Sequence, residues 1–494
     1  MPRSGAGALL ARPAFLRYLG LFGAVCCAVD AFVYGAAPYI RRNVTVVSIF
    51  REPAGPAILL LWFAGLAALC TAWWYGRRLL RDGVLTPRWI TVTAALWSAP
   101  LVFVPPLASR DMYANACQGA LVDAGLNPYL VGVSAQPCPW LDSVSVVWRD
   151  TPTPYGPVFL VLAGLAAAFG SQAVALAGFR LLAVLGVAAL AACLPVLARR
   201  AGVPVERALW LVLCCPLVPV HLIGGGHSDA LTVAFMIAGF MVLAAPSRSW
   251  GALLAGGALL GLAVSTKITI GVVLPFAALF AVGGLRRAGW SALLRRGAAL
   301  LAAALGVLAA ASLASGLGFG WLTALSGAGE SVNWSSPPTA VGLAAEAAGR
   351  WFGADLTVVP AVRAVALVLL GLSLLVILWR SRDRDPLAGA GLALLAVIFF
   401  APITQPWYLT WPLALFAVSA ARARWLAGTV VFAMATILPE GTGTFRPLGV
   451  PLSFAMVVLV IWVARRAVAW LRGVELAADD AIGAPAAKTS VAVP

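Results

Sequence analysis

The chain has 494 residues, of which 62% are hydrophobic and only 11% are charged, and its mean hydropathy is +0.96. A soluble globular protein is about half apolar and about a quarter charged, so this apolar surplus is too large for a water-soluble core. The composition predicts a polytopic membrane protein. It excludes a cytosolic enzyme, a secreted disulfide scaffold and a simple DNA-binding module.

The net charge of +16 arises from 34 basic and 18 acidic residues. On a soluble protein such a charge would favour nucleic-acid binding. In a membrane protein the positive-inside rule accounts for it, because cytoplasmic loops concentrate Lys and Arg. We therefore expect the lipid bilayer, and no nucleic acid, as a partner.

Hydropathy predicts an all-α fold of about fourteen transmembrane helices, because about 20 apolar residues cross a bilayer core and shorter runs can cross inside a bundle. The predicted spans are 17–39, 56–76, 89–108, 178–198, 208–224, 229–245, 250–266, 268–284, 297–318, 359–379, 386–402, 406–421, 424–439 and 448–471.

The stretch 156–170 is also apolar, but the basic residues argue against a crossing there. If it crossed, Arg199, Arg200 and Arg207 would lie outside the cytoplasm, against the positive-inside rule. We therefore expect an interfacial or re-entrant helix at the external face. Both chain termini are then cytoplasmic.

The expected organisation is a single integral-membrane domain over residues 1–472, followed by a disordered cytoplasmic tail over 473–494. The cytoplasmic loops are short and basic, whereas two external loops, 109–155 and 319–358, are long. Long loops without an obvious fold usually carry function. We therefore expect the active site on the external face.

The first external loop begins SRDMYANACQGALVDAGLNPY and places Asp111 beside Arg110, directly after the third span. A carboxylate there either marks the membrane interface or serves as a general base whose pKa is tuned by partial desolvation and by Arg110. Cys117 and Cys138 lie in the same loop, where an oxidising compartment would allow a disulfide. The proline-rich run DTPTPYGP then holds Tyr155 at the start of the interfacial segment.

Two cations stand at the expected external boundary. Arg180 lies at the external end of the following span, where it either snorkels to lipid headgroups or binds the phosphate of a lipid substrate. Lys267 is the only lysine outside the C-terminal tail and lies between two apolar segments. A boundary cation of this kind predicts an acidic or phosphate partner.

The stretch PVHLIGGGHSDAL contains both histidines of the chain, His221 and His227, together with three glycines and Asp229. It is either a tight turn with a polar cap or an anion site, because glycines let backbone amides approach a phosphate before a helix. A metal site at these three side chains lacks a fourth ligand nearby. We therefore expect no metal.

The run PITQPWYLTWP contains Gln405, Trp407 and Tyr408 between helix-breaking prolines. An aromatic belt at the membrane interface is one explanation. Stacking of sugar rings on the aromatic faces is the other.

The motifs SRDMYANACQGALVDAGLNPYLVG, TPTPYGP, LVPVHLIGGGHSDAL and QPWYLTWPLAL, in this order, carry a resemblance to known enzymes. With an Asp at the head of a large first external loop, the chain resembles the GT-C superfold of glycosyltransferases that use polyprenyl-phosphate sugars. The sequences of these motifs are similar to those of the actinobacterial polyprenol-phosphate-mannose-dependent α-1,6-mannosyltransferases. The resemblance extends from about residue 90 to residue 415.

The resemblance implies an inverting mannosyltransferase in the bacterial cytoplasmic membrane. It would move mannose from polyprenyl-phosphate-mannose to an α-1,6-mannan or lipomannan-type glycolipid acceptor on the external face. The implied roles are catalytic base for Asp111, donor contact for His227, and sugar-site lining for Tyr155, Gln405 and Trp407. From charge placement we add Arg180 and Lys267 to the donor site. We also expect Asp229 at the donor site, and Arg110 and Tyr408 at the sugar site.

Two alternatives stay open. The same fold could use another polyprenyl-phosphate sugar, such as glucose or arabinose. A lipid or glycolipid transporter would instead need inverted repeats, and the sequence contains no evident repeat. We expect no cofactor, because a lipid-phosphate leaving group requires cations and amide donors and the chain lacks a dinucleotide-binding fingerprint.

Overall fold

The computed structural model of the chain describes residues 9–41, 43–136, 138–327, 332, 334–421 and 424–471. Within these ranges the secondary structure is helical, apart from one isolated β-bridge between Ile437 and Gly443. The predicted all-α fold class is confirmed. The tail 473–494, for which we predicted disorder, lies outside the described residues.

The α-helices follow the apolar segments of the sequence. In chain order they are α2 (Pro13–Tyr34), α3 (Val46–Phe50), α4 (Gly55–Arg81), α5 (Pro87–Ser98), α6 (Asp111–Asp123), α7 (Pro157–Ala167), α8 (Gln172–Arg200), α9 (Val205–Leu213), α10 (Asp229–Leu243), α11 (Trp250–Thr266), α12 (Leu274–Val282), α13 (Leu285–Ala314), α14 (Trp321–Gly327), α15 (Pro337–Trp351), α16 (Val359–Ser381), α17 (Pro386–Phe400), α18 (Thr410–Ala417), α19 (Arg424–Met434) and α20 (Gly449–Leu471). Short 3₁₀ or π-helical turns join several of them: η1 (Ala99–Leu101), η2 (Leu141–Ser143), η3 (Val146–Trp148), η4 (Val218–Gly224), η5 (Ile268–Val273), η7 (Pro406–Leu409) and η8 (Arg446–Leu448).

Among the described residues, six helices are long and apolar enough to cross a membrane unaided, and a bent pair raises this number to seven. The six are α2, α4, α8, α13, α16 and α20. Other predicted spans form helices of 10–17 residues, including α10, α11 and α17. The prediction of about fourteen spans therefore stays a prediction, while a membrane protein with many apolar helices is confirmed.

The bent pair is the predicted span 208–224, which the chain breaks into α9 and the π-helical turn η4 with an angle of 58° between them. Pro216 and Pro219 lie at the break. A proline removes an amide donor and clashes with the preceding turn, so one straight helix cannot form. The bend brings His221 into the interior of the bundle.

The segment that the sequence predicts to be interfacial forms α7, an apolar helix of 11 residues. At 1.5 Å per residue it is about 16 Å long, about half of the ~30 Å hydrocarbon core. Its N-terminus is attached to the end of α11, because Gly156 N donates to Thr266 O at 3.1 Å. A Cβ on Gly156 would lie 2.2 Å from Ser265 O, so only glycine allows this approach.

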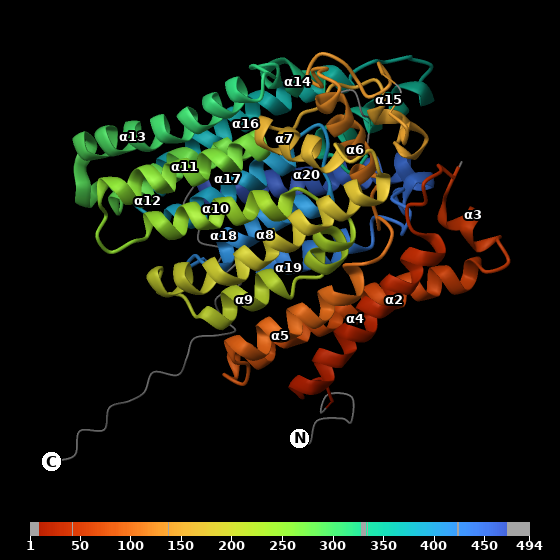
Figure 1. Cartoon of the computed structure of the whole chain (residues 1–494), viewed down its shortest axis with the longest axis horizontal. Coiled ribbons are helices and arrows are strands. Elements are labelled where there is room, and N and C mark those ends of the chain that lie inside the picture. The colour runs from red at the N-terminus through yellow and green to blue at the C-terminus, as the bar shows by residue number, and fades with distance from the viewer. Residues whose placement is uncertain are drawn as a thin grey trace.

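Both long loops that the sequence predicts to be external contain helices that the sequence did not predict. Residues 109–155 include α6, and residues 319–358 include α14 and α15. Nine of the 13 residues of α6 are buried, so this helix lacks the one-sided apolar stripe by which surface helices are recognised. In Figure 1, α6, α7, α14 and α15 lie in the upper part of the view, from its middle to its right side, whereas the turns that precede α9 and follow α12 lie at the left.

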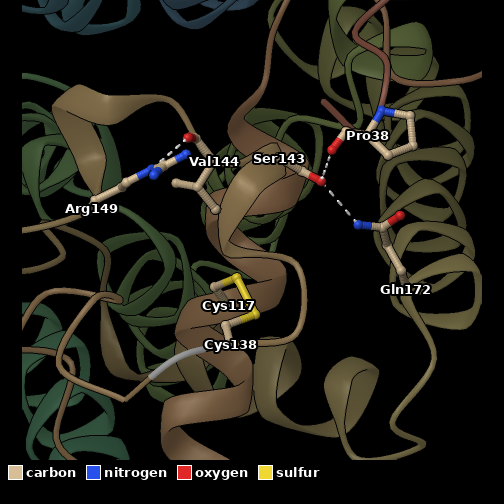
Figure 2. The surroundings of a disulfide bond; sticks show 7 residues. All are labelled: Pro38, Cys117, Cys138, Ser143, Val144, Arg149 and Gln172. Atoms are coloured by element: carbon tan, nitrogen blue, oxygen red, sulfur yellow. Dashed lines mark hydrogen bonds between the residues drawn. A yellow bond between two sulfur atoms is a disulfide. The ribbon is translucent and has the colours of Figure 1, made fainter. Parts of the chain in front are cut away.

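A disulfide between Cys117 of α6 and Cys138 holds the first long loop against the bundle (Figure 2). The segment after Cys138 is also anchored by side chains. Ser143 Oγ donates to Pro38 O at 2.6 Å, and Gln172 Nε2 of α8 donates to Ser143 Oγ at 3.3 Å. The disulfide that the sequence allowed is therefore present, and it stabilises the helix that begins with Asp111.

Replacing both Cys117 and Cys138 with Ser is expected to lower the free energy of unfolding by about 2–4 kcal/mol. The disulfide closes a loop with a sequence separation of 21 residues, and opening the loop raises the entropy of the unfolded chain. The melting temperature of the purified protein in detergent measures the effect. The control is Cys193→Ser, which removes a free thiol. Equal melting temperatures for wild type and the double variant would contradict a stabilising role.

Candidate active site

One cavity of about 200 Å³, with polar and charged side chains among its lining residues, brings together side chains from distant parts of the chain. It lies between α6, the loop before α7, the junction of α11 with η5, and the segment from α17 to α18. Among its lining residues are Asp111, Asn115, Gln118, Tyr155, Lys267, Thr269, Gln405, Tyr408 and Trp411. Ligand pockets for drug-sized molecules measure ~300–1,000 Å³, so this cavity suits a smaller group such as one sugar ring.

Five predicted site residues therefore lie around one space: Asp111, Tyr155, Lys267, Gln405 and Tyr408. His227, Trp407 and Asp229 contact members of this set without lining the cavity. Arg110 and Arg180 lie outside it and have other partners.

The helix α6 places three polar side chains on one wall. Asp111, Asn115 and Gln118 are spaced i, i+4 and i+7 and share a helix face. The chain enters α6 through Ala108, whose φ is 55° and whose amide donates to Pro439 O at 2.7 Å. Ser109 Oγ then accepts from Asp111 N at 3.0 Å. These contacts fix the first residue of the helix at the edge of the cavity.

Asp111 combines partial access with a raised pKa. Its side chain is 23% exposed. Burial raises the pKa of Asp111 to about 6, although the charge of Lys267 and the hydrogen bond with Ser109 act in the opposite direction. A carboxylate with this pKa is mostly ionised at neutral pH and can still accept a proton, which is the property that a general base requires.

His227 lies beside Asp111, with 3.5 Å between its Nδ1 and Asp111 Oδ2. Burial, with smaller contributions from His221 and Lys267, lowers the pKa of His227 well below its usual value. The imidazole is therefore neutral, and the contact with Asp111 is not an ion pair. Trp407 stacks on its ring, with 3.7 Å between the ring centroids.

The glycines before His227 shape the turn. Gly226 has φ of 61°, and a Cβ there would lie 2.5 Å from Met112 Sδ, so a larger residue does not fit. The amides of Gly225 and Gly226 donate to carbonyls of the η4 segment, with acceptors at His221 and Ile223. Since these amides are engaged, the turn positions His227 and does not offer them to an anion.

Lys267 and Asp229 form a buried ion pair at the inner wall. Lys267 Nζ lies 2.9 and 3.0 Å from the two Asp229 carboxylate oxygens, and Trp411 Nε1 donates to Oδ1 at 2.6 Å. Asp229 is the first residue of α10 and Lys267 follows the last residue of α11. The helix dipole favours an anion such as Asp229 at a helix N-terminus and a cation such as Lys267 at a helix C-terminus.

The ammonium of Lys267 also faces aromatic rings. It lies 4.4 Å from the ring centroid of Tyr408 and 4.9 Å from that of Trp411, within the range of cation–π attraction. An ammonium has three N–H donors, and the carboxylate of Asp229 occupies two. Lys267 therefore keeps a donor for a ligand in the cavity.

The two predicted arginines bind backbone carbonyls. Arg110 donates to Ala37 O at 3.0 Å, to Ser143 O at 2.9 Å and to Tyr39 O at 2.7 Å. Arg180 is buried and donates to Leu101 O and, at 3.1 Å, to Val104 O. Both guanidinium groups fix segments next to α6. Their positions give no support to a sugar-lining role for Arg110 or a phosphate-binding role for Arg180.

Four of the cavity residues named above were absent from the predicted site: Asn115, Gln118, Thr269 and Trp411. Gln118 would have followed from the spacing to Asp111 if the sequence had predicted a helix over 111–123. Trp411 lies in the predicted aromatic run, but its hydrogen bond to Asp229 joins residues 182 apart in sequence. No local pattern in the sequence signals Thr269.

Several buried polar atoms near the cavity have no hydrogen-bond partner among the described residues: Asn115 Oδ1, His227 Nε2 and Ser228 Oγ. Buried polar atoms are nearly always hydrogen-bonded in proteins. A polyhydroxylated ligand would supply both donors and acceptors to such atoms. Over the described ranges, no three His, Cys, Asp or Glu side chains are close enough to hold a metal ion, and the expectation of a metal-free reaction stays a prediction.

Comparison with known proteins identifies the family. The description "Alpha-(1→6)-mannopyranosyltransferase, N-terminal domain" matches residues 17–283, and "MptB C-terminal domain" matches residues 338–466. The cavity draws residues from both matched regions. No solved structure shows significant similarity to the chain.

Curated relatives carry the same activity in their names. The chain is 36% identical to alpha-(1→6)-mannopyranosyltransferase A of Mycobacterium tuberculosis over 399 residues, which cover 78% of this chain and 76% of the relative. It is 32% identical to a probable alpha-(1→6)-mannopyranosyltransferase of Mycolicibacterium smegmatis, covering 85% and 81%. It is 30% identical to alpha-(1→6)-mannopyranosyltransferase A of Corynebacterium glutamicum, covering 73% and 78%. The chain therefore belongs to the alpha-(1→6)-mannopyranosyltransferase family and is a glycosyltransferase embedded in a membrane.

Proposed function

We propose that this enzyme transfers mannose from polyprenyl-phosphate-mannose to an α-1,6-linked mannan or lipomannan-type glycolipid, with inversion at the anomeric carbon. One observation carries the proposal. The carboxylate of Asp111 and the ammonium of Lys267 line the same cavity of about 200 Å³. A base for the acceptor and a cation for the leaving phosphate are the two groups that this transfer requires.

In the proposed reaction, Asp111 accepts the proton of the acceptor hydroxyl as the hydroxyl oxygen attacks the anomeric carbon of mannose. The new bond joins that oxygen to the anomeric carbon. The bond from the anomeric carbon to the phosphate oxygen breaks, and its electron pair leaves with the polyprenyl phosphate. Because attack and departure occur on opposite faces of the sugar, the configuration inverts.

Lys267 would stabilise the charge that develops on the leaving phosphate. Preorganised charges in a water-excluded site act strongly on a transition state, and Asp229 with Trp411 hold the ammonium in place. Asn115 would accept a hydrogen bond from a sugar hydroxyl through its unpartnered Oδ1. His227 would position the carboxylate of Asp111, and Trp407 would hold the imidazole of His227.

A transfer assay tests the donor and acceptor. Purified enzyme is incubated with polyprenyl-phosphate-mannose and a short α-1,6-mannoside, and the product linkage is determined. We expect mannosyl transfer to form an α-1,6 bond, and no transfer from a nucleotide-linked mannose. Transfer only from polyprenyl-phosphate glucose or arabinose would assign another donor. Movement of intact lipid between leaflets of a vesicle, without glycosidic bond formation, would indicate the transporter alternative.

We further propose that the cavity opens to the external side of the bacterial cytoplasmic membrane and that both termini are cytoplasmic. Ser171 precedes α8 and Val203 follows it, so the two positions report opposite sides. Single cysteines are introduced there after replacement of the six free cysteines. We expect an impermeant maleimide to label position 171 of intact cells from outside and position 203 only after lysis. The reverse pattern would overturn the orientation.

A further inference from the structure

A second concave surface lies next to the cavity, on the outside of the bundle. It is an apolar groove of about 580 Å³ between η5, the start of α12 and the helix α16. Its lining includes Gly271, Val272 and Phe276 on one wall and Gly371, Leu374 and Leu378 on the other. The stretch of α16 that borders it, residues 368–378, is about 15 Å long at 1.5 Å per residue.

One short element, η5, borders both the cavity and the groove. Ile268 and Thr269 of η5 line the cavity, whereas Gly271 and Val272 of the same turn line the groove. Lys267 directly precedes η5. With a rise of about 2 Å per residue in a 3₁₀ helix, Lys267 lies about 8 Å along the chain from Gly271. A charged site and an apolar groove therefore meet at a distance that one amphipathic ligand can span.

The surroundings of the groove are open to lipid. The helix α16 is the least enclosed of the long helices together with α20, with 6% of its apolar window buried. Val368, Leu372 and Leu375 are more than half exposed. A hydrocarbon chain can thus enter sideways from the bilayer, without passing through the cavity.

We infer that this groove receives the hydrocarbon tail of the lipid-linked donor, while the donor phosphate lies at Lys267. The inference rests on the proposed function. Bilayer lipid is as apolar as the groove, so moving the tail from the bilayer into the groove releases little hydrophobic free energy. Its contribution is orientation: a tail that follows η5 and α16 directs the phosphate toward Lys267 and the anomeric carbon toward Asp111.

Two glycines make the inference testable, because both groove walls can be filled without a clash. A Cβ on Gly371 meets no atom within 4 Å, and one on Gly271 meets only Val264 at an ordinary 3.9 Å. Gly371→Leu and Gly271→Phe therefore place new side chains in or against the groove. The matched control is Gly306→Leu, since Gly306 is an exposed glycine inside α13 with no atom within 4 Å of its Cβ position.

The readout compares two donors. One is mannose on a long polyprenyl phosphate, and the other is citronellyl-phosphate-mannose, whose short tail hardly enters the groove. With the long donor we expect Gly371→Leu to lower kcat/KM by about 10–100-fold, because a small misplacement at the reacting centre costs up to about 10²-fold. With the short donor it should match wild type and Gly306→Leu. Equal values for both donors in each variant would overturn the assignment.

The other occupants of the groove give different results. If the tail of a glycolipid acceptor lies there, the substitution raises the KM of that acceptor and leaves donor kinetics unchanged. If only bulk lipid lies there, no kinetic constant changes. Either result overturns the inference while leaving mannosyl transfer itself intact. Failure of wild type to use either donor would instead contradict the proposed function.

Crosslinking provides a measurement that does not depend on turnover. A mannosyl-phosphate donor analogue with a diazirine in its polyprenyl tail is irradiated with wild-type enzyme in nanodiscs. We expect labelled peptides from η5, α12 and α16, with loss of the label in Gly371→Leu. Labelling confined to other helices would overturn the inference.

Discussion

Asp111→Asn is expected to lower kcat by about 10²–10⁴-fold, the usual contribution of general acid–base catalysis. The substitution keeps the shape of the side chain, its place next to His227 Nδ1 and the start of α6. It removes the carboxylate that we propose accepts the proton of the acceptor hydroxyl. Single-turnover transfer with saturating donor and acceptor measures the effect, and donor affinity should change little.

The pH dependence provides a second readout. Because burial raises the pKa of Asp111 to about 6, the ionised and active form is lost as the pH falls through this value. Wild-type turnover should therefore decline below about pH 6, and the residual activity of Asp111→Asn should not show this decline.

The control for Asp111 is Asp123→Asn, which changes an exposed carboxylate at the other end of the same helix. It should keep the wild-type rate and pH profile. Wild-type turnover in a well-folded Asp111→Asn protein would rule out a base at this position. An equal loss in Asp123→Asn would indicate a general sensitivity of α6 instead.

Lys267→Met is expected to lower both stability and turnover. Removing one partner of a buried ion pair leaves the other charge uncompensated, which costs about 3–5 kcal/mol. Asp229 would then keep only the hydrogen bond from Trp411. Loss of one preorganised stabiliser of the transition state reduces kcat by about 10²–10³-fold. Thermal unfolding in detergent and single-turnover rates measure the two effects separately.

The double variant Lys267→Met with Asp229→Asn separates structure from catalysis. Asparagine still offers an oxygen to Trp411 Nε1 and carries no charge, so most of the lost stability should return. Turnover should not return, because the cation for the leaving phosphate is still absent. Recovery of both stability and turnover would show that Lys267 has only a structural role, as the partner of Asp229.

The sequence predicted the parts of the site that depend on a single residue and its environment. Asp111, Lys267 and Tyr408 were each unusual for their place in an apolar chain, and the structure brings all three to one cavity. It also predicted the helical class, because the apolar runs are long. The helix α6 was not predicted, because nine of its 13 residues are buried and it lacks the one-sided apolar stripe of a surface helix.

What the sequence could not provide is the choice of partner for each charge. Arg180 and Lys267 looked alike as boundary cations. In the structure Arg180 binds the carbonyls of Leu101 and Val104, whereas Lys267 pairs with Asp229 across 38 residues. Both a carbonyl and a carboxylate can accept the hydrogen bonds of a buried cation, and the fold determines which of the two lies close to it. The break of the span 208–224, by contrast, follows from Pro216 and Pro219, which are visible in the sequence.

The cavity takes Asp111 and Lys267, the proposed base and cation, from the region before residue 283, and much of its remaining wall from the region after residue 338. Neither region contains a complete site. A hybrid that joins the first region of one family member to the second region of another would inherit the proton acceptor from one parent and the aromatic surface from the other. Exchanging the two regions should therefore change the preference for the sugar more readily than it changes the type of reaction that is catalysed. Two co-expressed fragments, cut between the matched regions, should be active only when they reassemble.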